Sequence, residues 1–322
     1  MAVNGRGSAI TGIGSALPDV VVTNKDLETM FTTSDEWIRE RTGIHERRVV
    51  SWGTGDHSPA GSTATLAADA GAKAMADAGV GPDDIDLIIL ATTSPDQTVP
   101  ATSAHVQELL GVRGGAFDVN AACSGFVYAC TVANGLIATG MDRVLVIGAE
   151  TLSRITDWTD RSTAILFADG AGAVVMESSP GDGNLLGWDL GANGALRPIL
   201  YCDTGGYLTM EGKEVFRRAV RAMVQSAETA MERAKVTAAD IDLYVPHQAN
   251  IRIIDSALPR LGLSMDKTVV TIDHSGNSSS ASIPIALAEA VGAGRVKDGD
   301  LILLSGFGAG MTWASAVWRW GR

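Results

Sequence analysis

The sequence contains few cysteines and few aromatic residues, and both shortages limit what the protein can be. Only three cysteines occur among 322 residues, at positions 123, 130 and 202. Cys123 and Cys130 are seven residues apart on one predicted helix, roughly 10 Å by helical rise, which is too far for a disulfide. We therefore expect a reducing, cytoplasmic setting. The aromatic content of 5%, with 37 glycines, favours closely packed α/β layers joined by tight turns.

Three other features are missing from the sequence. It has no run of 18 or more apolar residues and no N-terminal segment like a signal peptide, so we expect no membrane association. Acidic residues outnumber basic ones by 37 to 25, and the formal net charge of −12 argues against general nucleic-acid binding. HExxH and paired CxxC motifs are absent, and we expect no metal ion.

An internal repeat divides the chain. The segment AMADAGVGPDDIDL begins at Ala74 and AMERAKVTAADIDL begins at Ala230, with eight of fourteen positions identical. The offset is 230 − 74 = 156 residues, which is too long for a solenoid repeat. DRVLVIGAE (142–150) has a counterpart in DLILLSGFG (300–308). Continuous apolar strands are typical of sheets buried on both faces. We predict two similar α/β halves packed with pseudo-two-fold symmetry.

The stretch AFDVNAACSGFVYA (116–129) carries a candidate nucleophile. Its pattern predicts a strand, a turn of small residues containing Cys123, and an apolar helix. A thiol over the first turn of a helix lies near unpaired N–H groups and the positive end of the dipole, so we expect a lowered pKa. The alternative is a small buried residue of an apolar helix. Adding the repeat offset points to Ser279 in HSGNSSSASIPIAL (274–287), and we predict that the two turns meet near the symmetry axis.

Two further side chains occupy places where chemistry is expected. His247 follows a predicted strand and Asn277 lies in the second small-residue turn, and the carboxyl ends of strands carry the ligand site in open α/β sheets. With Cys123, they could supply a thiolate and two neutral donors that stabilise an oxyanion or an enolate. His274 is a secondary possibility. The glycine-rich segment 306–310 is not a dinucleotide loop, because a strand-like pattern follows it where a helix is required.

Seven blocks then carry a family resemblance: TSDEWIRERTGI (33–44), AACSGF (121–126), DRSTAILFADGAGAVV (160–175), LTMEGKEVFRRAV (208–220), VPHQANIRI (245–253), GNSSSASIP (276–284) and GFGAGMTWASA (306–316). In order and spacing, over nearly the full length, the chain resembles β-ketoacyl-acyl-carrier-protein synthase III of the thiolase-like superfamily. The resemblance implies an α/β fold with αβαβα layers, made of two pseudo-symmetric halves, and a homodimer. Residues 1–180 would carry the cysteine, and residues 181–322 the histidine and asparagine.

The resemblance also implies a reaction. Cys123 would take an acyl group from acyl-CoA, and decarboxylation of malonyl-acyl-carrier protein would give an enolate that attacks the acyl-cysteine. His247 and Asn277 would stabilise that enolate, and the backbone N–H groups of Cys123 and Ala309 would form the oxyanion hole. Ala309 stands where the family commonly has glycine. No cofactor is implied, since acyl-CoA is a substrate.

Binding residues follow from the same resemblance. Trp37 and Arg161 would sandwich the CoA adenine, with Arg41 near the phosphates. The pantetheine tunnel would be lined by Met210, Gly212, Asn250 and Phe307. The acidic carrier protein would contact Arg217, Gln248, Arg252 and Arg260. Val99 stands where some relatives place an aromatic residue that closes the acyl pocket of the partner subunit, so a longer or branched primer could fit.

Several alternatives remain open from the sequence. A priming ketosynthase of a polyketide pathway would share these blocks. A catalytically idle relative is disfavoured, because it has no chemical need for Cys123, His247 and Asn277 together. A thiolase would want a second reactive cysteine near the end of the chain, and residues 300–322 contain none. Hydroxymethylglutaryl-CoA synthase would want a glutamate near the nucleophile, and the cysteine turn has none.

Overall fold

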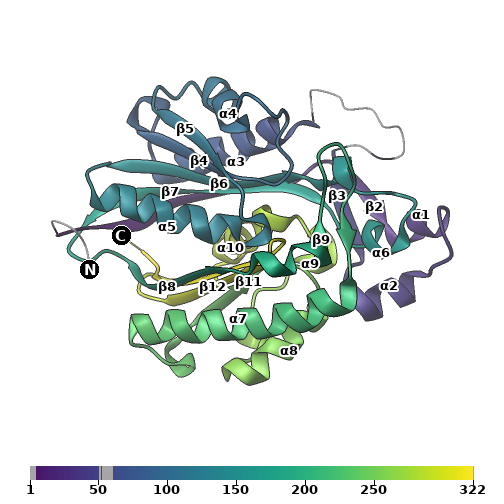
Figure 1. Cartoon of the computed structure of the whole chain (residues 1–322). Coiled ribbons are helices and arrows are strands. Elements are labelled where there is room, and N and C mark those ends of the chain that lie inside the picture. The colour runs from purple at the N-terminus through teal and green to yellow at the C-terminus, as the bar shows by residue number, and fades with distance from the viewer. Residues whose placement is uncertain (1–4, 51, 53–60, 322) are drawn as a thin grey trace.

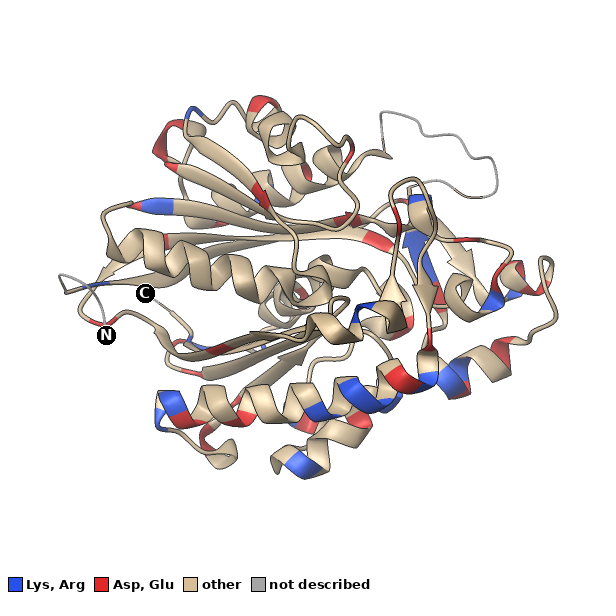
Figure 2. Cartoon of the chain, in the orientation of Figure 1, with Lys and Arg blue, Asp and Glu red and all other residues tan. Residues whose placement is uncertain are grey.

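The computed structural model describes residues 5–50, 52 and 61–321, and it consists of five layers (Figure 1). Two sheets enclose a central helical layer, and further helices cover the outer face of each sheet. The predicted αβαβα arrangement is confirmed. Charged residues avoid the central layer, since helix α5 (Gly125–Ala138) contains none of them and α10 (Ser282–Gly292) only Glu289 (Figure 2).

The first sheet is built from the amino-terminal part of the chain. Its strand order is β1-β7-β6-β4-β5, and the strands are β1 (Arg6–Ala16), β4 (Leu87–Ala91), β5 (Gly115–Val119), β6 (Arg143–Thr151) and β7 (Asp169–Pro180). Strands β5, β4 and β6 are mutually parallel, while β7 pairs antiparallel with β6 and β1. Helices α3 (Thr63–Ala78) and α4 (Thr102–Leu110) cover its outer face.

The second sheet repeats this plan in the carboxy-terminal part. Its strand order is β11-β12-β13-β8, and the strands are β8 (Leu185–Ala192), β11 (Leu243–Pro246), β12 (Leu301–Gly308) and β13 (Thr312–Arg319). The helices α7 (Gly212–Ala234) and α8 (Ile251–Leu261) lie outside it. As in the first sheet, a strand that follows the repeated sequence segment, β11, pairs parallel with its neighbour β12.

The central layer explains why small residues dominate its sequence. Helix α5 buries glycine, alanine and cysteine, and α10 buries alanine beside isoleucine and leucine. Both contribute to one apolar cluster that contains strands from the two sheets. Small side chains let the helices lie close to both sheets, and burying apolar area at roughly 25 cal/mol per Å² holds the halves together.

Smaller elements lie around one end of the layers. The helices are α1 (Asn24–Glu28), α2 (Asp35–Thr42), α6 (Arg161–Ala164) and α9 (Ile272–Ser275), and the strands are β2 (Val20–Thr23), β3 (Glu46–Val49), β9 (Leu200–Tyr201) and β10 (Thr209–Met210). Several short 3₁₀ turns complete the fold: η3 (Pro82–Asp84), η4 (Ala122–Ser124), η5 (Leu152–Ile155), η6 (Gly194–Ile199), η7 (Ala238–Asp240), η8 (Met265–Lys267) and η9 (Ser279–Ala281). Of these, η4 and η9 lead into the central helices α5 and α10.

Candidate active site

Two equivalent turns meet at the centre of the molecule, as the repeat predicts. In each, a residue with left-handed backbone, Ala122 or Ser279 with φ of 47°, begins a 3₁₀ turn that enters a central helix. The helices begin at Gly125 and Ser282, and 282 − 125 = 157. The structural counterpart of Cys123 is therefore Ser280, one residue beyond the Ser279 that the sequence offset predicts. The extra residue lies between β11 and α10, outside the repeated segment.

A cavity of about 660 Å³ brings the three predicted catalytic side chains together. Cys123, His247 and Asn277 all line it, although they come from three different turns. The predicted tunnel residues line it as well: Met210, Gly212, Asn250 and Phe307. Arg41 and Arg252 also belong to the wall. The cavity thus joins the reactive centre to exposed cationic side chains.

Cys123 lies in η4, just before α5, and its side chain is only partly exposed. Burial raises the pKa of its thiol to about 12; a hydrogen bond with Ser279 and one from its own backbone N–H act in the opposite direction, and the charge of Glu150 adds to the rise. The expectation of a lowered pKa is therefore wrong. Removal from water outweighs the stabilisation that the end of a helix provides to a thiolate. The thiol must therefore lose its proton before or during any attack by this sulfur.

His247 directly follows β11, and Asn277 lies between α9 and η9. Both side chains are buried, with 2% and 5% exposure. Burial lowers the pKa of His247 to about 3, so the imidazole is neutral near pH 7. Asn277 is fixed by its backbone, which pairs with the chain at Leu166 and Ala168, and its Oδ1 accepts a hydrogen bond from the N–H of Ser279 at 2.9 Å. The sequence expectation of a neutral histidine beside an amide agrees with this geometry.

The glycine-rich end of β12 packs against the backbone of the nucleophile. A Cβ at Gly308 would lie 2.4 Å from the backbone nitrogen of Cys123, so any side chain there would collide with the turn. Ala309 lines a second cavity of about 390 Å³, to which Cys123 also contributes. None of the hydrogen bonds between the described residues uses the N–H of Ala309. Among the described residues that N–H is left available as a donor, and its part in an oxyanion hole stays a prediction.

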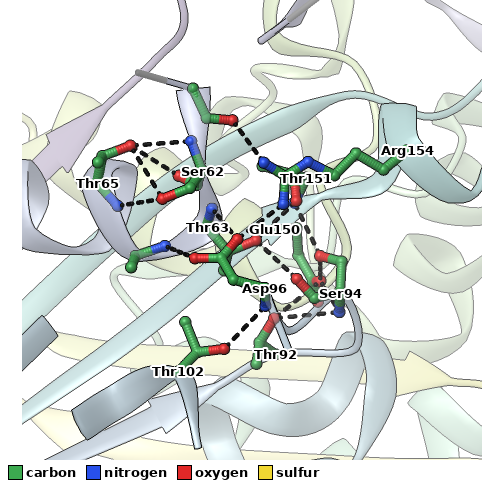
Figure 3. Close-up of polar contacts among 12 residues, drawn as sticks. Ser62, Thr63, Thr65, Thr92, Ser94, Asp96, Thr102, Glu150, Thr151 and Arg154 are labelled. Atoms are coloured by element: carbon green, nitrogen blue, oxygen red, sulfur yellow. Dashed lines mark hydrogen bonds and ion pairs between the residues drawn. The ribbon is translucent and has the colours of Figure 1, made fainter. Parts of the chain in front are cut away.

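Glu150 is a residue of this region that the sequence analysis missed. It is fully buried in β6 and accepts hydrogen bonds from Thr93 N at 3.0 Å, Ser94 Oγ at 2.5 Å and Ser280 Oγ at 2.8 Å. Figure 3 shows its carboxylate directed toward the loop after β4. The residue links the two halves next to Cys123. An acidic residue directly after the apolar run VLVIGA of β6 was the signal that could have identified it.

The second buried group behind the site is Arg47, which the sequence analysis also missed. It is 0% exposed, and its guanidinium donates to the carbonyl of Ile165 at 3.1 Å and to Asn24 Oδ1 at 2.8 Å. A Cβ at Gly276 would lie 2.9 Å from its Cβ. Glycine is needed there, also because its φ is +70°. Arg47 thus supports the backbone that presents Asn277.

The expected adenine-binding residues lie together at the surface. Arg41 and Arg161 each place their guanidinium carbon near the ring centroid of Trp37, at 4.6 Å and 4.7 Å. Arg161 also donates to the carbonyl of Thr32 at 2.9 Å. These are cation–π contacts, and the distance from Arg161 to the indole leaves no room for a purine between them. The predicted sandwich therefore requires Arg161 to move outward.

Three of the four residues expected to contact a carrier protein lie at the surface. Arg217, Arg252 and Arg260 are exposed on α7 and α8, where Figure 2 shows a basic stretch along α7. Arg217 is paired with Glu214 at 2.7 Å. Gln248 is a wrong prediction, because it is 0% exposed and its amide is used within the protein. Its Nε2 donates to the carbonyls at positions 246 and 269, and its Oε1 accepts the N–H groups at positions 271 and 272.

Two other candidates lie away from the cavities around Cys123. Val99 is 82% exposed on the loop before α4, and the structure places it in neither cavity that Cys123 lines. His274 instead contacts Asp273 at 2.9 Å and Glu289 at 3.1 Å. Hydrogen bonds to these two carboxylates raise the pKa of His274 to about 10. This histidine is a charged bridge between α9 and α10.

Among residues 5–50, 52 and 61–321, no group of three or more His, Cys, Asp or Glu side chains is arranged to hold a metal ion. Within the same residues, no helix combines the length and the apolar character needed to cross a membrane.

The layered fold and the cavity between its halves define a thiolase-like condensing acyltransferase. The chain belongs to the 3-oxoacyl-[acyl-carrier-protein] synthase III family, whose models match residues 117–194 and, for the C-terminal part, residues 231–320. The predicted family and enzyme class are confirmed.

Relatives and solved structures extend over the whole chain. The sequence is 48% identical over 330 residues to beta-ketoacyl-[acyl-carrier-protein] synthase III of Dinoroseobacter shibae, covering 98% of this chain and 100% of that protein. The crystal structure of 3-oxoacyl-[acyl-carrier-protein] synthase III from Aquifex aeolicus matches with a TM-score of 0.92 and 44% identity, covering 98% and 100% of the two chains. The priming β-ketosynthase of the R1128 polyketide pathway matches with a TM-score of 0.90 and 35% identity, covering 98% and 96%.

Proposed function

We propose that this protein condenses an acyl-CoA primer with malonyl-acyl-carrier protein through an acyl-Cys123 intermediate, and so initiates fatty-acid chains. The observation that carries the proposal is the single cavity that holds Cys123, His247 and Asn277 and reaches the basic surface at Arg41 and Arg252. A cavity that runs from exposed cationic side chains to the sulfur suits a phosphopantetheine arm, whose phosphate end stays outside while its thioester reaches the sulfur.

In the first half-reaction, Cys123 attacks the thioester carbonyl of acyl-CoA. The N–H groups of Cys123 and Ala309 hold the oxyanion. The C–S bond to CoA breaks, the thiol proton of Cys123 goes to the departing CoA sulfur, and an acyl-Cys123 thioester remains. The raised pKa of Cys123 fits this concerted course, since the free enzyme stores little thiolate at neutral pH.

In the second half-reaction, malonyl-acyl-carrier protein occupies the cavity. The malonyl C–C bond breaks, CO₂ leaves, and the electron pair forms an enolate whose oxygen accepts hydrogen bonds from His247 and Asn277. Both donors are neutral, so no proton is lost to the enolate oxygen. The enolate carbon attacks the acyl-Cys123 carbonyl, and the released thiolate takes up a proton. The products are a β-ketoacyl-carrier protein and CO₂.

The second cavity next to Cys123 is the proposed acyl pocket. Its apolar wall includes Ile155, Phe167, Leu200 and Leu208, which suits a hydrocarbon chain. We propose that the enzyme is a cytoplasmic homodimer in which Val99 of one subunit borders the acyl pocket of the other. Its small side chain would admit a longer or branched primer.

The carrier protein is proposed to dock on α7 and α8. Charge reversal by Arg217→Glu should raise KM for malonyl-acyl-carrier protein several-fold at low salt, and the difference should shrink at high salt. Arg113→Glu, which alters a surface arginine paired with Asp83 in the other half, is the matched control. Equal effects of both substitutions would refute the docking surface.

The decisive experiment measures the mass of the intact protein after incubation with acetyl-, isobutyryl- and longer acyl-CoAs, and again after adding malonyl-acyl-carrier protein. Wild-type protein should gain the acyl mass and lose it in the second step, and Cys123→Ala should gain none. Acylation that survives the second step would contradict the condensation. No acylation by any acyl-CoA would contradict CoA priming.

A second candidate is a priming ketosynthase of a polyketide pathway. The structural likeness to the R1128 priming β-ketosynthase supports this candidate. The same mass measurement separates the two. Strict preference for acetyl-CoA and a fatty-acid carrier protein supports the first function, whereas a different primer with a polyketide carrier protein supports the second.

A further inference from the structure

The ring of His247 is held from behind by one serine. Nδ1 of His247 lies 2.6 Å from Oγ of Ser282, and the same Oγ accepts a hydrogen bond from the backbone N–H of Gln248 at 3.3 Å. His247 and Ser282 are 2% and 1% exposed. No hydrogen bond between the described residues uses Nε2, which leaves this nitrogen as the polar atom that His247 presents to the cavity.

The direction of these two hydrogen bonds follows from which groups carry protons. A backbone N–H can only donate, so Ser282 Oγ accepts from Gln248. The hydroxyl proton of Ser282 then needs an acceptor, and among the described residues Nδ1 of His247 is the only other partner of that oxygen. If Nδ1 carried a proton instead, Ser282 Oγ would accept two hydrogen bonds. The buried hydroxyl proton of Ser282 would then have no acceptor. Buried donors without partners are rare in proteins.

We propose that Ser282 is a positioning residue that fixes His247 as the Nε2–H tautomer, with its proton directed into the cavity. The inference rests on the proposed function, in which His247 donates to the enolate oxygen. The opposite tautomer would place a lone pair there and repel that oxygen. The burial that lowers the pKa of His247 keeps the ring neutral, so only one nitrogen is protonated and the choice matters.

The same segment sets the direction of the second donor. Oδ1 of Asn277 accepts the N–H of Ser279, which turns Nδ2 and its two protons away from Ser279. Ser279 is the first residue of η9, and Ser282 is the first residue of α10, which follows directly. The donor direction of both enolate-binding groups therefore comes from two residues three positions apart, Ser279 and Ser282. A hydrogen-bond partner that fixes a histidine tautomer is familiar from metal sites, and here it serves a substrate oxygen.

The test measures the tautomer directly in the ligand-free enzyme. Protein with ¹⁵N-labelled histidine is examined by NMR, which distinguishes a protonated from an unprotonated ring nitrogen, and His247→Gln assigns the signal. In the wild type we expect protonation at Nε2. In Ser282→Ala we expect a mixture of both tautomers. Ser278→Ala is the matched control, because Ser278 is buried in the same segment and its hydroxyl has no partner among the described residues.

The two half-reactions give a second readout. Ser282→Ala should slow decarboxylation of malonyl-acyl-carrier protein roughly 10- to 100-fold, as loss of an orienting partner does for other histidines. Acylation of Cys123 should change less than about two-fold, whereas a general loss of structure would slow both steps. Ser278→Ala should affect neither.

Protonation of His247 at Nδ1 in the wild type would overturn the proposal, and that measurement needs no variant to fold. An unchanged tautomer in Ser282→Ala would overturn it too. If the wild type decarboxylates no malonyl-carrier substrate, the proposed function fails, and the NMR result still decides the role of Ser282.

Discussion

The turns η4 and η9 have nearly the same backbone but different tasks. In η4, Cys123 faces two cavities, and a reactive atom is accessible to substrate. In η9, the equivalent Ser280 is 1% exposed, and its hydroxyl is directed to the carbonyl of Ala91 and to Glu150. One copy of the turn performs chemistry and the other fastens the halves together. A duplicated fold can therefore divide reactivity and support between two copies of one element.

The largest expected effect comes from making the two turns alike. Cys123→Ser places a hydroxyl where the thiol stands, and hydroxyls attack thioesters poorly without a strong base. Condensation should fall by roughly 10³-fold or more, measured by kcat/KM and by the acyl mass. Cys130→Ala, which alters a buried cysteine in α5, is the control and should keep acylation. Rapid acylation of the Cys123→Ser protein would show that the thiol is dispensable.

The next largest effect comes from removing the charge of Glu150, which binds Ser280 of η9 and acts on Cys123 of η4. In Glu150→Gln, an amide NH₂ would face the donors Thr93 and Ser94, which leaves buried groups unpaired. The free energy of unfolding should fall by about 2–3 kcal/mol, measured with a chemical denaturant. Loss of the negative charge should also lower the pKa of Cys123, so its alkylation profile should shift to lower pH.

Asp169→Asn provides the control for this pair of effects. Asp169 is another fully buried carboxylate, which accepts hydrogen bonds from Ser153 and from the N–H of Val50. Its substitution should lower stability without shifting the alkylation profile of Cys123. A profile that shifts equally in both variants would show that general loosening, not the charge of Glu150, changes the thiol.

A milder change tests the supporting turn alone. Ser280→Ala removes two possible hydrogen bonds but keeps the Cβ, while Glu150 retains its partners Thr93 and Ser94. Stability should fall by about 1 kcal/mol, and the rate of Cys123 acylation should stay within about two-fold. A much larger loss of acylation than of stability would mean that Ser280 acts in catalysis and that the division of tasks between the turns is wrong.

The sequence predicted more of the fold than of the site's electrostatics. Apolar runs such as LIIL indicated the buried strands of both sheets, because Ile, Leu and Val in a run are typical of burial. The repeat indicated two similar halves, and its offset predicted the meeting of the two turns to within one residue. Motif resemblance placed Cys123, His247 and Asn277, which the structure brings into one cavity.

What the sequence could not provide depends on contacts between distant segments. The pKa of Cys123 depends on its burial between the two halves and on the charge of Glu150, which lies on β6. The inward direction of Gln248 depends on backbone partners at positions 269–272. A local sequence pattern indicates which side of a helix or strand is buried, but not which distant residues pack against it. For that reason it predicts neither the pKa of Cys123 nor the orientation of Gln248.

The smallest expected effect concerns how α9, which precedes η9, is tied to α10, which follows it. His274 bridges Asp273 and Glu289, and these carboxylates raise its pKa from 6.5 to about 10. A group with a raised folded-state pKa contributes full stability below its unfolded value, and that contribution is lost as pH rises toward the folded value. Wild-type protein should therefore lose stability between about pH 6.5 and 10 that His274→Gln does not lose.

This difference should stay below about 1 kcal/mol, because the His274 side chain is 41% exposed and solvent screens the pair. Thermal unfolding of both proteins at pH 6, 8 and 10 measures it, with Tm curves that converge as the pH rises. His105→Gln is the control, since that residue is exposed on α4 in the other half of the molecule. Parallel Tm curves for wild type and His274→Gln would show that the bridge adds nothing, and that η9 is held by Glu150 and the packing of α10 alone.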